Sequence, residues 1–501
     1  MTVGFETMTF LPQWRALSAK LTLGSCVALL LVLYVALLWF SAASQGNIHT
    51  GDTDNLAAGT RTALDCIHLG EFTRCGFFEG TRQSSVFPYP LLQYLPAAVF
   101  IKAGASNDHA VELLARLNIV AFGLSFIFAW VVLRRRKGMW PLACAAVLAG
   151  TATYQSTAGF GEMLAGTTIL GALAAARSRR WWLIAAAFTV ACIGKETFPP
   201  FVLALGLIVA RDDHDGWLPS RARLLPMTLG TMLGFGLSAA FNVFRFGTPR
   251  NLSYLDPELR TPGLWRKASF VVAQWLSPNA GIVWFWPVAT LLLLLCGTVG
   301  VQRVIRGKPL DSWAWPVAVV AVAFAFTIAL TFWYTPFGWI AYGPRLATPL
   351  LPAAVVAALY VTAGPIRSLV GCLARVPALF ATLVVVVALS GWPQYGAPWT
   401  NGAAVEDLIA ADASCPRMTD FAIQGDKGFY YRCATHMMWR IEPGVLDDAA
   451  TGGSIAAMVA RAVGALATAG AVAAVAKPTS IRRSRPAAKL PRRSPAGTAL
   501  G

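Results

Sequence analysis

The sequence predicts an all-α polytopic membrane protein, with about 11 to 13 transmembrane helices and interfacial helices in its first outer loop. Of the 501 residues, 56% are hydrophobic and only 13% are charged. Several runs of about twenty residues carry almost no charge, and this length crosses a bilayer as a helix. A soluble protein of this size would need a polar surface that this composition cannot supply, so the bilayer is the expected solvent.

Windows of apolar residues place the expected helices. The first, 21–44, follows basic residues as a signal peptide would, but its length and the many later spans favour a membrane helix. Further spans are expected at 113–133, 139–157, 162–176, 181–194, 197–210, 224–244, 282–300, 313–334, 346–362, 376–392 and 455–476. The proline-interrupted segment 89–103 is expected to be interfacial or re-entrant, because a span there would move the next basic loop to the opposite side.

Basic residues predict the orientation of these helices. The clusters fall on one side of the scheme, at 134–137, 177–180, 221–223, 303–308 and 482–493. That side is cytoplasmic by the positive-inside rule, which places the N-terminus and the C-terminal tail in the cytoplasm. The net charge of +17 is therefore interpreted as a topology signal, and no nucleic-acid partner is expected.

The chain is expected to divide into four parts. Residues 1–392 form the transmembrane domain, which includes the first outer loop at 45–112. Residues 393–454 form a small extracytoplasmic cap segment, and 455–476 the last transmembrane helix. Residues 477–501, rich in proline, arginine and alanine, form a basic cytoplasmic tail that is expected to be disordered.

Four of the nine cysteines fall in segments expected outside the cytoplasm. An even number of cysteines on the oxidising side is what disulfides require. Partners that share a loop meet most readily, so Cys66 is expected to pair with Cys75, and Cys415 with Cys433. Four unpaired thiols are the alternative.

Two carboxylates, Asp52 and Asp54, lie directly beyond the outer end of the first helix. Acidic residues at a membrane boundary are often only solvated loop residues, and this alternative applies to each of them. Two acids at this spacing beside Gly51 are less usual. A carboxylate here could act as a general base that takes a proton from an acceptor hydroxyl.

Several other charged residues border predicted spans on the outer side. They are Glu162, Lys195, Glu196, Arg245, Arg250 and Arg345. Charges next to hydrocarbon are costly and are usually paired or functional. Lys195, Arg250 and Arg345 would suit a phosphate on a lipid carrier, arginine by bidentate contact and lysine as a point charge. The alternatives are a snorkelling turn at Lys195 and Glu196, and a lipid-headgroup anchor at Arg250.

Six segments in order resemble the GT-C superfamily of membrane glycosyltransferases, which includes the protein O-mannosyltransferases and the lipid A aminoarabinose transferases. They are the acidic first outer loop, Phe-Pro-Tyr-Pro-Leu-Leu at 87–92, Gly-Lys-Glu at 194–196, Phe-Gly-Thr-Pro at 246–249, Leu-Ser-Pro-Asn-Ala-Gly-Ile-Val-Trp at 276–284, and Tyr-Gly-Pro-Arg at 342–345. Each motif alone is weak, and their order and common side carry the resemblance, which runs from about residue 20 to 362.

The resemblance implies a hexosyl- or pentosyltransferase in the plasma (inner) membrane, with an extracytoplasmic active site. The donor would be a polyprenyl-phosphate-linked sugar, and the acceptor a lipid, glycan or protein. Asp52 takes the position of the family's catalytic acid, but Thr53 stands where many members have Glu. Asp54 is the substitute acid, so the choice of base stays open. A divalent cation, Mg²⁺ or Mn²⁺, is a candidate cofactor that Asp54 would help to hold.

Two other functions compete with the transferase. A transporter or flippase of lipid-linked glycans would concentrate charges near the bilayer midplane and often show repeated halves, whereas here the acids lie in outer loops. A non-catalytic membrane subunit with the same fold is the third hypothesis. The sequence contains no P-loop, no dinucleotide fingerprint after a strand and no zinc spacing, so nucleotide-driven chemistry is not expected. The enzyme is favoured.

Overall fold

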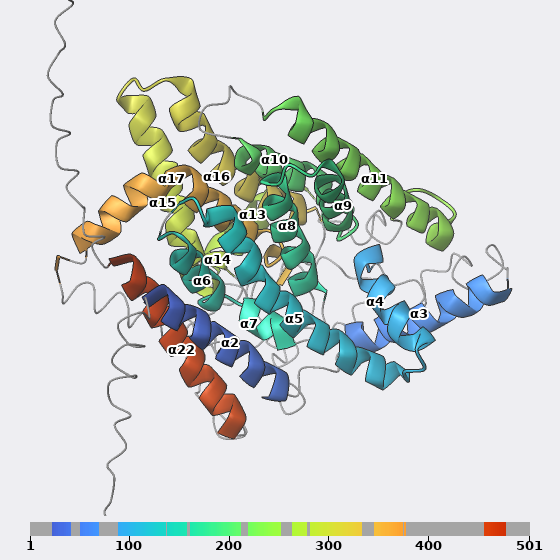
Figure 1. Ribbon diagram of the computed structural model, residues 1–501. Coiled ribbons are helices and arrows are strands. Elements are labelled where there is room, and N and C mark those ends of the chain that lie inside the picture. The colour runs from blue at the N-terminus through green and yellow to red at the C-terminus, as the bar shows by residue number, and fades with distance from the viewer. Residues whose placement is uncertain are drawn as a thin grey trace, which may run out of the picture.

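The protein is represented by a computed structural model, and every regular element that it describes is a helix (Figure 1). The described residues are 23–41, 51–69, 89–136, 138–157, 161–211, 219–251, 263–277, 281–332, 345–373, 375–376 and 455–476. The predicted span 376–392, the cap segment 393–454 and the tail 477–501 lie almost wholly outside them.

The helices follow one another as short and long rods. They are α2 (Leu23–Ser41), α3 (Gly51–Leu69), α4 (Leu91–Lys102), α5 (Asn107–Leu133), α6 (Trp140–Leu148), α7 (Ala152–Thr157), α8 (Glu162–Ala176), α9 (Trp181–Cys192), α10 (Pro199–Ala210), α11 (Arg221–Phe246), α13 (Leu264–Leu276), α14 (Ile282–Phe285), α15 (Pro287–Ile305), α16 (Leu310–Leu330), the 3₁₀ helix η3 (Arg345–Ala347), α17 (Leu351–Leu373) and α22 (Ile455–Ala476).

Five of the described helices are long and apolar enough to cross a membrane, namely α5, α11, α15, α16 and α17. Shorter apolar stretches of 10–17 residues lie in α2, α4, α8, α9, α10 and α22. The predicted all-α, multi-pass membrane fold is therefore confirmed. Which end of the bundle faces the cytoplasm stays a prediction.

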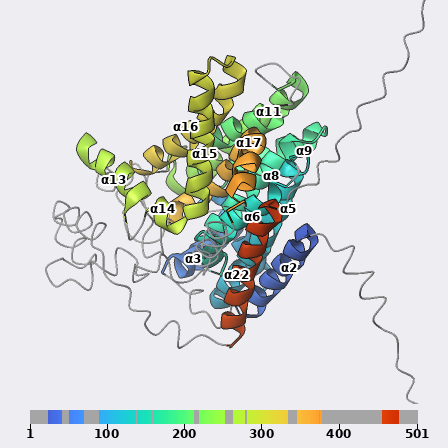
Figure 2. The same cartoon turned by 90° about the vertical axis from the view of Figure 1, so that its left-hand side faces the viewer.

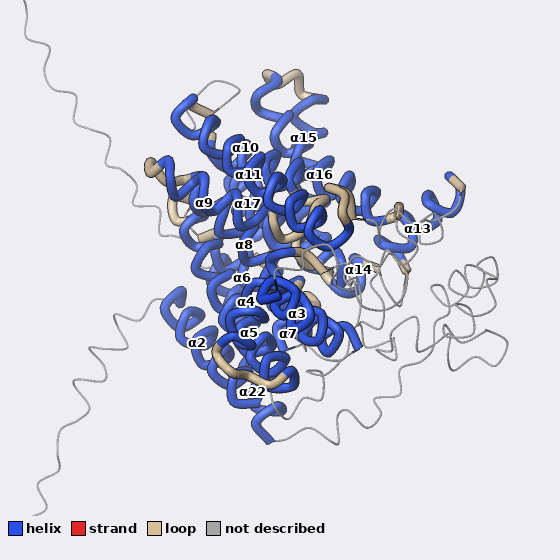
Figure 3. The backbone as a smooth tube through the Cα atoms, turned by 90° about the vertical axis from the view of Figure 1, so that its right-hand side faces the viewer, coloured by secondary structure: helices blue, strands red, loops and turns tan. Residues whose placement is uncertain are grey.

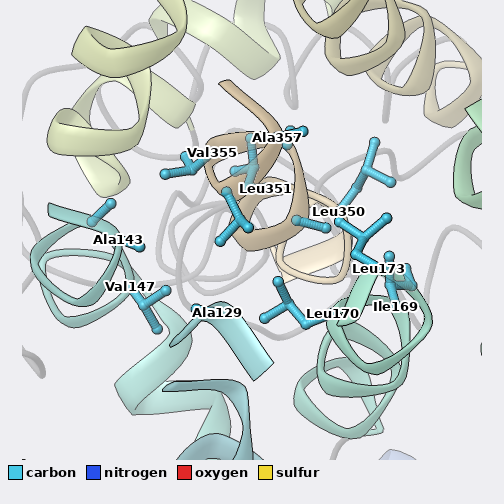
Figure 4. Packing of buried hydrophobic residues seen from close by; sticks show 14 of the residues in the cluster. Ala129, Ala143, Val147, Ile169, Leu170, Leu173, Leu350, Leu351, Val355 and Ala357 are labelled. Atoms are coloured by element: carbon cyan, nitrogen blue, oxygen red, sulfur yellow. The ribbon is translucent and has the colours of Figure 1, made fainter. Parts of the chain in front are cut away.

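Helix α17 lies at the centre of the bundle and contacts α6, α8, α10, α15 and α16. Its first turns are composed of leucine, proline, alanine and valine, and they are buried without interruption from Leu351 to Leu359. Figure 4 shows Leu351 and Val355 among Val147 of α6 and Leu170 of α8. A helix that is apolar on all sides is buried on all sides, which places this segment in the core.

Helices α9 and α11 pack closely through two glycines. A Cβ atom at Gly230 would lie 2.3 Å from the carbonyl oxygen of Ala185, and one at Gly234 would lie 2.6 Å from that of Thr189. The Thr189 hydroxyl also donates to the Gly230 carbonyl over 3.1 Å. Small residues four positions apart let membrane helices approach to backbone contact. The α9 and α11 helices therefore form one closely joined pair.

The first and last described helices, α2 and α22, pack side by side although they are far apart in sequence (Figures 1 and 2). Gly464 of α22 faces the ring of Tyr34, and a Cβ atom there would lie 2.9 Å from two ring carbons. Residue 464 belongs to the predicted last span, 455–476, whose bounds agree with α22. The C-terminal helix is thus part of the bundle.

Two predicted spans are broken in the structure. The span 139–157 divides into α6 and α7 because Gly150 lies against the ring of Trp286, where a Cβ atom would be 2.3 Å from a ring carbon. The span 282–300 divides into α14 and α15 at Trp286, which has φ −137° and ψ 53°. The span 346–362 begins later, after η3, and continues to Leu373 across a kink at Thr362.

The outer segments contain three further helices. The predicted interfacial helix at 89–103 is α4, preceded by Pro90 and containing Pro96. Helix α3 lies before it in the first outer loop, and Figure 3 shows α3 and α4 together against α5. Helix α13 was not predicted from the sequence, because its basic residues Arg266 and Lys267 interrupt an otherwise amphipathic run.

Candidate functional site

Five charged side chains gather where the ends of four helices meet. Glu162 begins α8, Lys195 and Glu196 lie in the turn between α9 and α10, Arg245 lies in the last turn of α11, and Arg345 begins η3. We call this group the charged cluster. Its members come from distant parts of the sequence and are joined by ion pairs and by electrostatic interactions with Lys195.

Two ion pairs form the framework of the cluster. Arg345 Nε lies 3.1 Å from Glu162 Oε1, and the two side chains are 7% and 12% exposed. Arg245 Nη2 lies 3.4 Å from Glu196 Oε1, and these side chains are 0% and 20% exposed. Buried charges persist when they are paired and hydrogen-bonded, so each cation here has a fixed partner.

Arg245 is bound on several sides by the chain itself. Its Nη1 donates to the Tyr89 carbonyl over 2.6 Å, and its Nη2 donates to the Asn242 side chain. Asn251 donates to the same oxygen of Glu196 over 3.2 Å. These contacts connect α11 to the start of α4 and to the turn that carries Glu196. Arg245 therefore acts as an anchor for the cluster.

Lys195 lies between the two ion pairs. Burial lowers the pKa of its amine, the carboxylates of Glu162 and Glu196 oppose that change, and the charge of Arg345 adds to it. The amine interacts with members of both pairs, so it connects them. Desolvation disfavours a charged lysine, and an additional anion beside it would favour the charged form.

The charges of the cluster do not cancel. Three cations and two carboxylates leave a net charge of +1 in a largely buried site. Net charge next to hydrocarbon is costly unless a further ion compensates it. A phosphodiester carries a single negative charge, and arginine and lysine are the side chains that bind phosphate oxygens best. The cluster therefore matches such a group in charge and chemistry.

Helix α4 lies directly on the cluster. The Leu92 N–H donates to the Ile193 carbonyl over 3.3 Å, two residues before Lys195. The Gln93 side chain occupies the space next to Gly161, where a Cβ atom would lie 2.2 Å from it. The proline-rich motif at 87–92 thus leads into a helix that contacts both the α9–α10 turn and the start of α8.

The two predicted catalytic acids lie in the first turn of α3, which begins at Gly51. Asp54 is exposed, and the side chain of Asp52 lies outside the described residues. Leu56, one half-turn further, is buried against Tyr94 of α4, and Tyr94 in turn lies 6.0 Å from the Arg245 guanidinium. Helix α4 therefore links the acids to the charged cluster, and the catalytic role of each acid stays a prediction.

Arg250, predicted as a phosphate ligand, is exposed, and its backbone N–H donates to the Thr248 hydroxyl over 3.1 Å. No described contact joins its side chain to the cluster. Arg245 takes the buried position instead, although the predicted phosphate-binding set did not include it. The signal that would have found it is the spacing of Asn242 and Arg245, which places both on one face of α11.

The cysteine predictions fall mostly outside the described residues. Cys66, in α3, is disulfide-bonded, whereas Cys75, Cys415 and Cys433 lie in segments that the structure does not describe. The five other cysteines are free thiols: Cys26, Cys144, Cys192, Cys296 and Cys372. The pairings of Cys66 with Cys75 and of Cys415 with Cys433 stay predictions.

A divalent cation also stays a prediction. Within the described part of the chain, no group of three or more His, Cys, Asp or Glu side chains is arranged to hold a metal ion. The chemistry considered below therefore uses the chain's own residues.

Comparison with known proteins gives a likeness of fold. No protein-family model matches the sequence, and no curated protein sequence matches it. The structure is similar to that of ArnT from Cupriavidus metallidurans in the apo state, with a TM-score of 0.44 and 15% identity over 89% of this chain and 77% of that chain. The structure of ArnT bound to undecaprenyl phosphate gives a TM-score of 0.42 and 14% identity with the same coverage. ArnT is a GT-C glycosyltransferase, and the likeness is one of fold alone.

Proposed function

We propose that the protein is a glycosyltransferase that moves a sugar from a polyprenyl-phosphate-linked donor to an extracytoplasmic acceptor. The observation that carries the proposal is the charged cluster, a buried site with a net charge of +1 beneath a helix of the first outer loop. The ordered motifs of the GT-C superfamily in the sequence support the same reaction.

The donor phosphate would bind to Lys195 and Arg345. Glu162 holds Arg345 through the 3.1 Å ion pair, so the guanidinium is oriented before the donor arrives. Arg245 holds Glu196 beside Lys195 in the same way. Cations fixed in advance need no reorganisation during the reaction, which is the main source of electrostatic stabilisation in enzymes. Arg250 remains a candidate ligand at the exposed edge.

The reaction changes the charge of the phosphate. The acceptor oxygen forms a bond to the anomeric carbon, and the bond from that carbon to the phosphate oxygen breaks. The electron pair remains on the phosphate, whose charge changes from −1 to −2, and the acceptor proton passes to Asp52 or Asp54 as general base. The charged cluster is then bound more tightly in the transition state than in the ground state, which lowers the barrier.

The flippase hypothesis predicts a different dependence on the membrane. A flippase moves an intact lipid between leaflets and leaves the bond between sugar and phosphate unbroken. In detergent solution, where there are no leaflets, a transferase can still release polyprenyl phosphate, with water as a slow acceptor. Release of polyprenyl phosphate by purified protein in detergent therefore separates the two functions.

The test uses purified full-length protein and a synthetic polyprenyl-phosphate sugar, with polyprenyl phosphate measured by mass spectrometry. We expect Lys195→Ala and Arg345→Ala each to weaken donor binding by roughly 10- to 100-fold, since each loses a charge-assisted hydrogen bond. Arg306→Ala is the control, because Arg306 is an exposed cation at the other end of the bundle. If no preparation releases polyprenyl phosphate and the variants bind donor like wild type, the proposal is wrong.

A further inference from the structure

A long apolar groove runs between α5, α8 and α9. Its volume is about 660 Å³. Val120, Leu124 and Phe128 of α5 form one wall, and Ala187 and Val190 of α9 form the other. At the end where α5 and α8 finish, the lining changes to Arg134, Arg177 and Ser178. We call this space the apolar groove.

A smaller cavity of about 60 Å³ continues from that polar end. It shares Val131, Arg134 and Arg177 with the apolar groove, so the two spaces are continuous. Its charged lining consists of five arginines: Arg134, Arg135, Arg177, Arg179 and Arg223. No acidic residue lines it within the described chain. We call this space the arginine cavity.

Only two of these arginines have an evident structural role. Arg177 Nη1 donates to the carbonyls of Val209 and Arg211, and Arg223 donates to that of Ala210, so both cap the end of α10. The guanidinium groups of Arg134, Arg135 and Arg179 form no hydrogen bond or ion pair with any described residue. Five like charges around one small cavity repel one another, and an anion would relieve that repulsion.

We propose that the apolar groove and the arginine cavity together bind one anionic phospholipid of the surrounding membrane. Its phosphate would lie in the arginine cavity and its acyl chains in the apolar groove. A free phosphate would leave the groove unfilled, and a zwitterionic lipid would not compensate the charge. Basic pockets between membrane helices are known to bind anionic headgroups. The site lies at the opposite end of α8 from Glu162, so it does not depend on the transferase reaction.

One alternative anion belongs to the chain itself. Asp212, Asp213 and Asp215 lie between α10 and α11, outside the described residues. If these carboxylates neutralise the arginine cavity, the wild-type chain will not bind the lipid there, and a variant with all three changed to Asn will. That result would overturn the proposal.

The experiment measures lipid binding to delipidated full-length protein by native mass spectrometry. The probes are phosphatidylglycerol, phosphatidylcholine with the same acyl chains, and inorganic phosphate. We expect Arg134→Ala, Arg135→Ala and Arg179→Ala in combination to weaken phosphatidylglycerol binding on the order of 100-fold, as three surface cations would. The matched control removes three exposed cations at the same end but outside the cavity, Arg221→Ala, Arg306→Ala and Lys308→Ala.

A second variant tests the groove without changing any charge. Ala187→Trp would fill part of the apolar groove and weaken phosphatidylglycerol binding by about tenfold, the loss expected when two methylene groups are displaced. Ala321→Trp on an exposed face of α16 is its control. Equal losses in the control and cavity variants would overturn the proposal by showing diffuse attraction, and so would equal binding of phosphatidylcholine or inorganic phosphate. Displacement of phosphatidylglycerol by polyprenyl phosphate at the same arginines would reassign the site and overturn it as well.

Discussion

The charged cluster and the arginine cavity lie at opposite ends of the same helices. At the cluster, the buried arginines have fixed carboxylate partners, as Arg345 has in Glu162. At the other end, the one described acid is Asp311, which lies 3.8 Å from Arg211 and is 52% exposed. Paired, buried charges hold a geometry that chemistry requires, whereas exposed like charges attract a ligand without orienting it. The difference teaches that charge density alone does not identify an active site, and that fixed pairing is the better sign.

The largest expected effect concerns the base. Asp52→Asn should reduce turnover by roughly 10²- to 10⁴-fold, with donor binding nearly intact, because general-base help is lost while the phosphate contacts remain. Donor turnover and donor binding are measured separately.

Asp311→Asn is the control from the arginine end and should leave turnover unchanged, since Asp311 is half-exposed and remote from the cluster. If Asp54→Asn abolished turnover and Asp52→Asn did not, the two acids exchange roles. If neither change mattered, the base lies elsewhere.

The next effect compares the stabilities of the two ends. Glu162→Gln should destabilise the fold by about 3–5 kcal/mol, because it leaves the buried Arg345 without its partner. Asp311→Asn should cost only about 0–1 kcal/mol, because that ion pair is exposed to solvent. Thermal unfolding in detergent measures both. Equal destabilisation by the two changes would contradict the distinction drawn here.

A third prediction uses pH. Since burial lowers the pKa of Lys195, donor binding should fall as pH rises through that lowered value, by roughly 10- to 100-fold for the lost charge-assisted contact. Folding stability should change in the opposite direction. The unfolded chain binds this proton more tightly, so stability should rise with pH between the lowered pKa and the ordinary lysine value.

Lys195→Arg is the matched variant, because arginine stays charged throughout and should remove the alkaline loss of binding. An unchanged pH profile in this variant would show that another group titrates.

The smallest effect concerns the helices that join the two ends. Gly234→Ala should cost about 1–3 kcal/mol, because the new Cβ atom would lie 2.6 Å from the Thr189 carbonyl oxygen. Gly236→Ala on the same helix meets nothing within 4 Å and should be neutral or stabilising by up to about 1 kcal/mol. Thermal unfolding of the two variants checks this, and matching losses would mean that α9 and α11 are not joined through Gly234.

Much of the fold could be predicted because local sequence carries it. Glu162 precedes a long apolar run and marks the start of α8, and the bounds predicted for α22 agree with the structure. The break at Gly150 could not be predicted, because its cause is Trp286, which lies far along the chain. Helix α3 was not given bounds for a different reason: its many polar residues resemble a loop, and its helical form is supported by packing of Leu56 on α4.

The site could be predicted in its residue types but less well in its partners. Sequence reasoning selected Glu162, Lys195, Glu196 and Arg345, because charges beside apolar runs are unusual. It preferred Arg250 to Arg245, since nothing local distinguishes them. The distinguishing contact is the Tyr89 carbonyl, 156 residues earlier in the chain.

The charged cluster also has an order of assembly. A chain is synthesised from its N-terminus, so four of its members are made first: Glu162, Lys195, Glu196 and Arg245. Their charges sum to zero. Arg345 follows 100 residues after Arg245 and adds the single positive charge. A nascent chain that stopped before η3 would therefore contain α8 to α11 complete, yet would have no net charge with which to attract a phosphate.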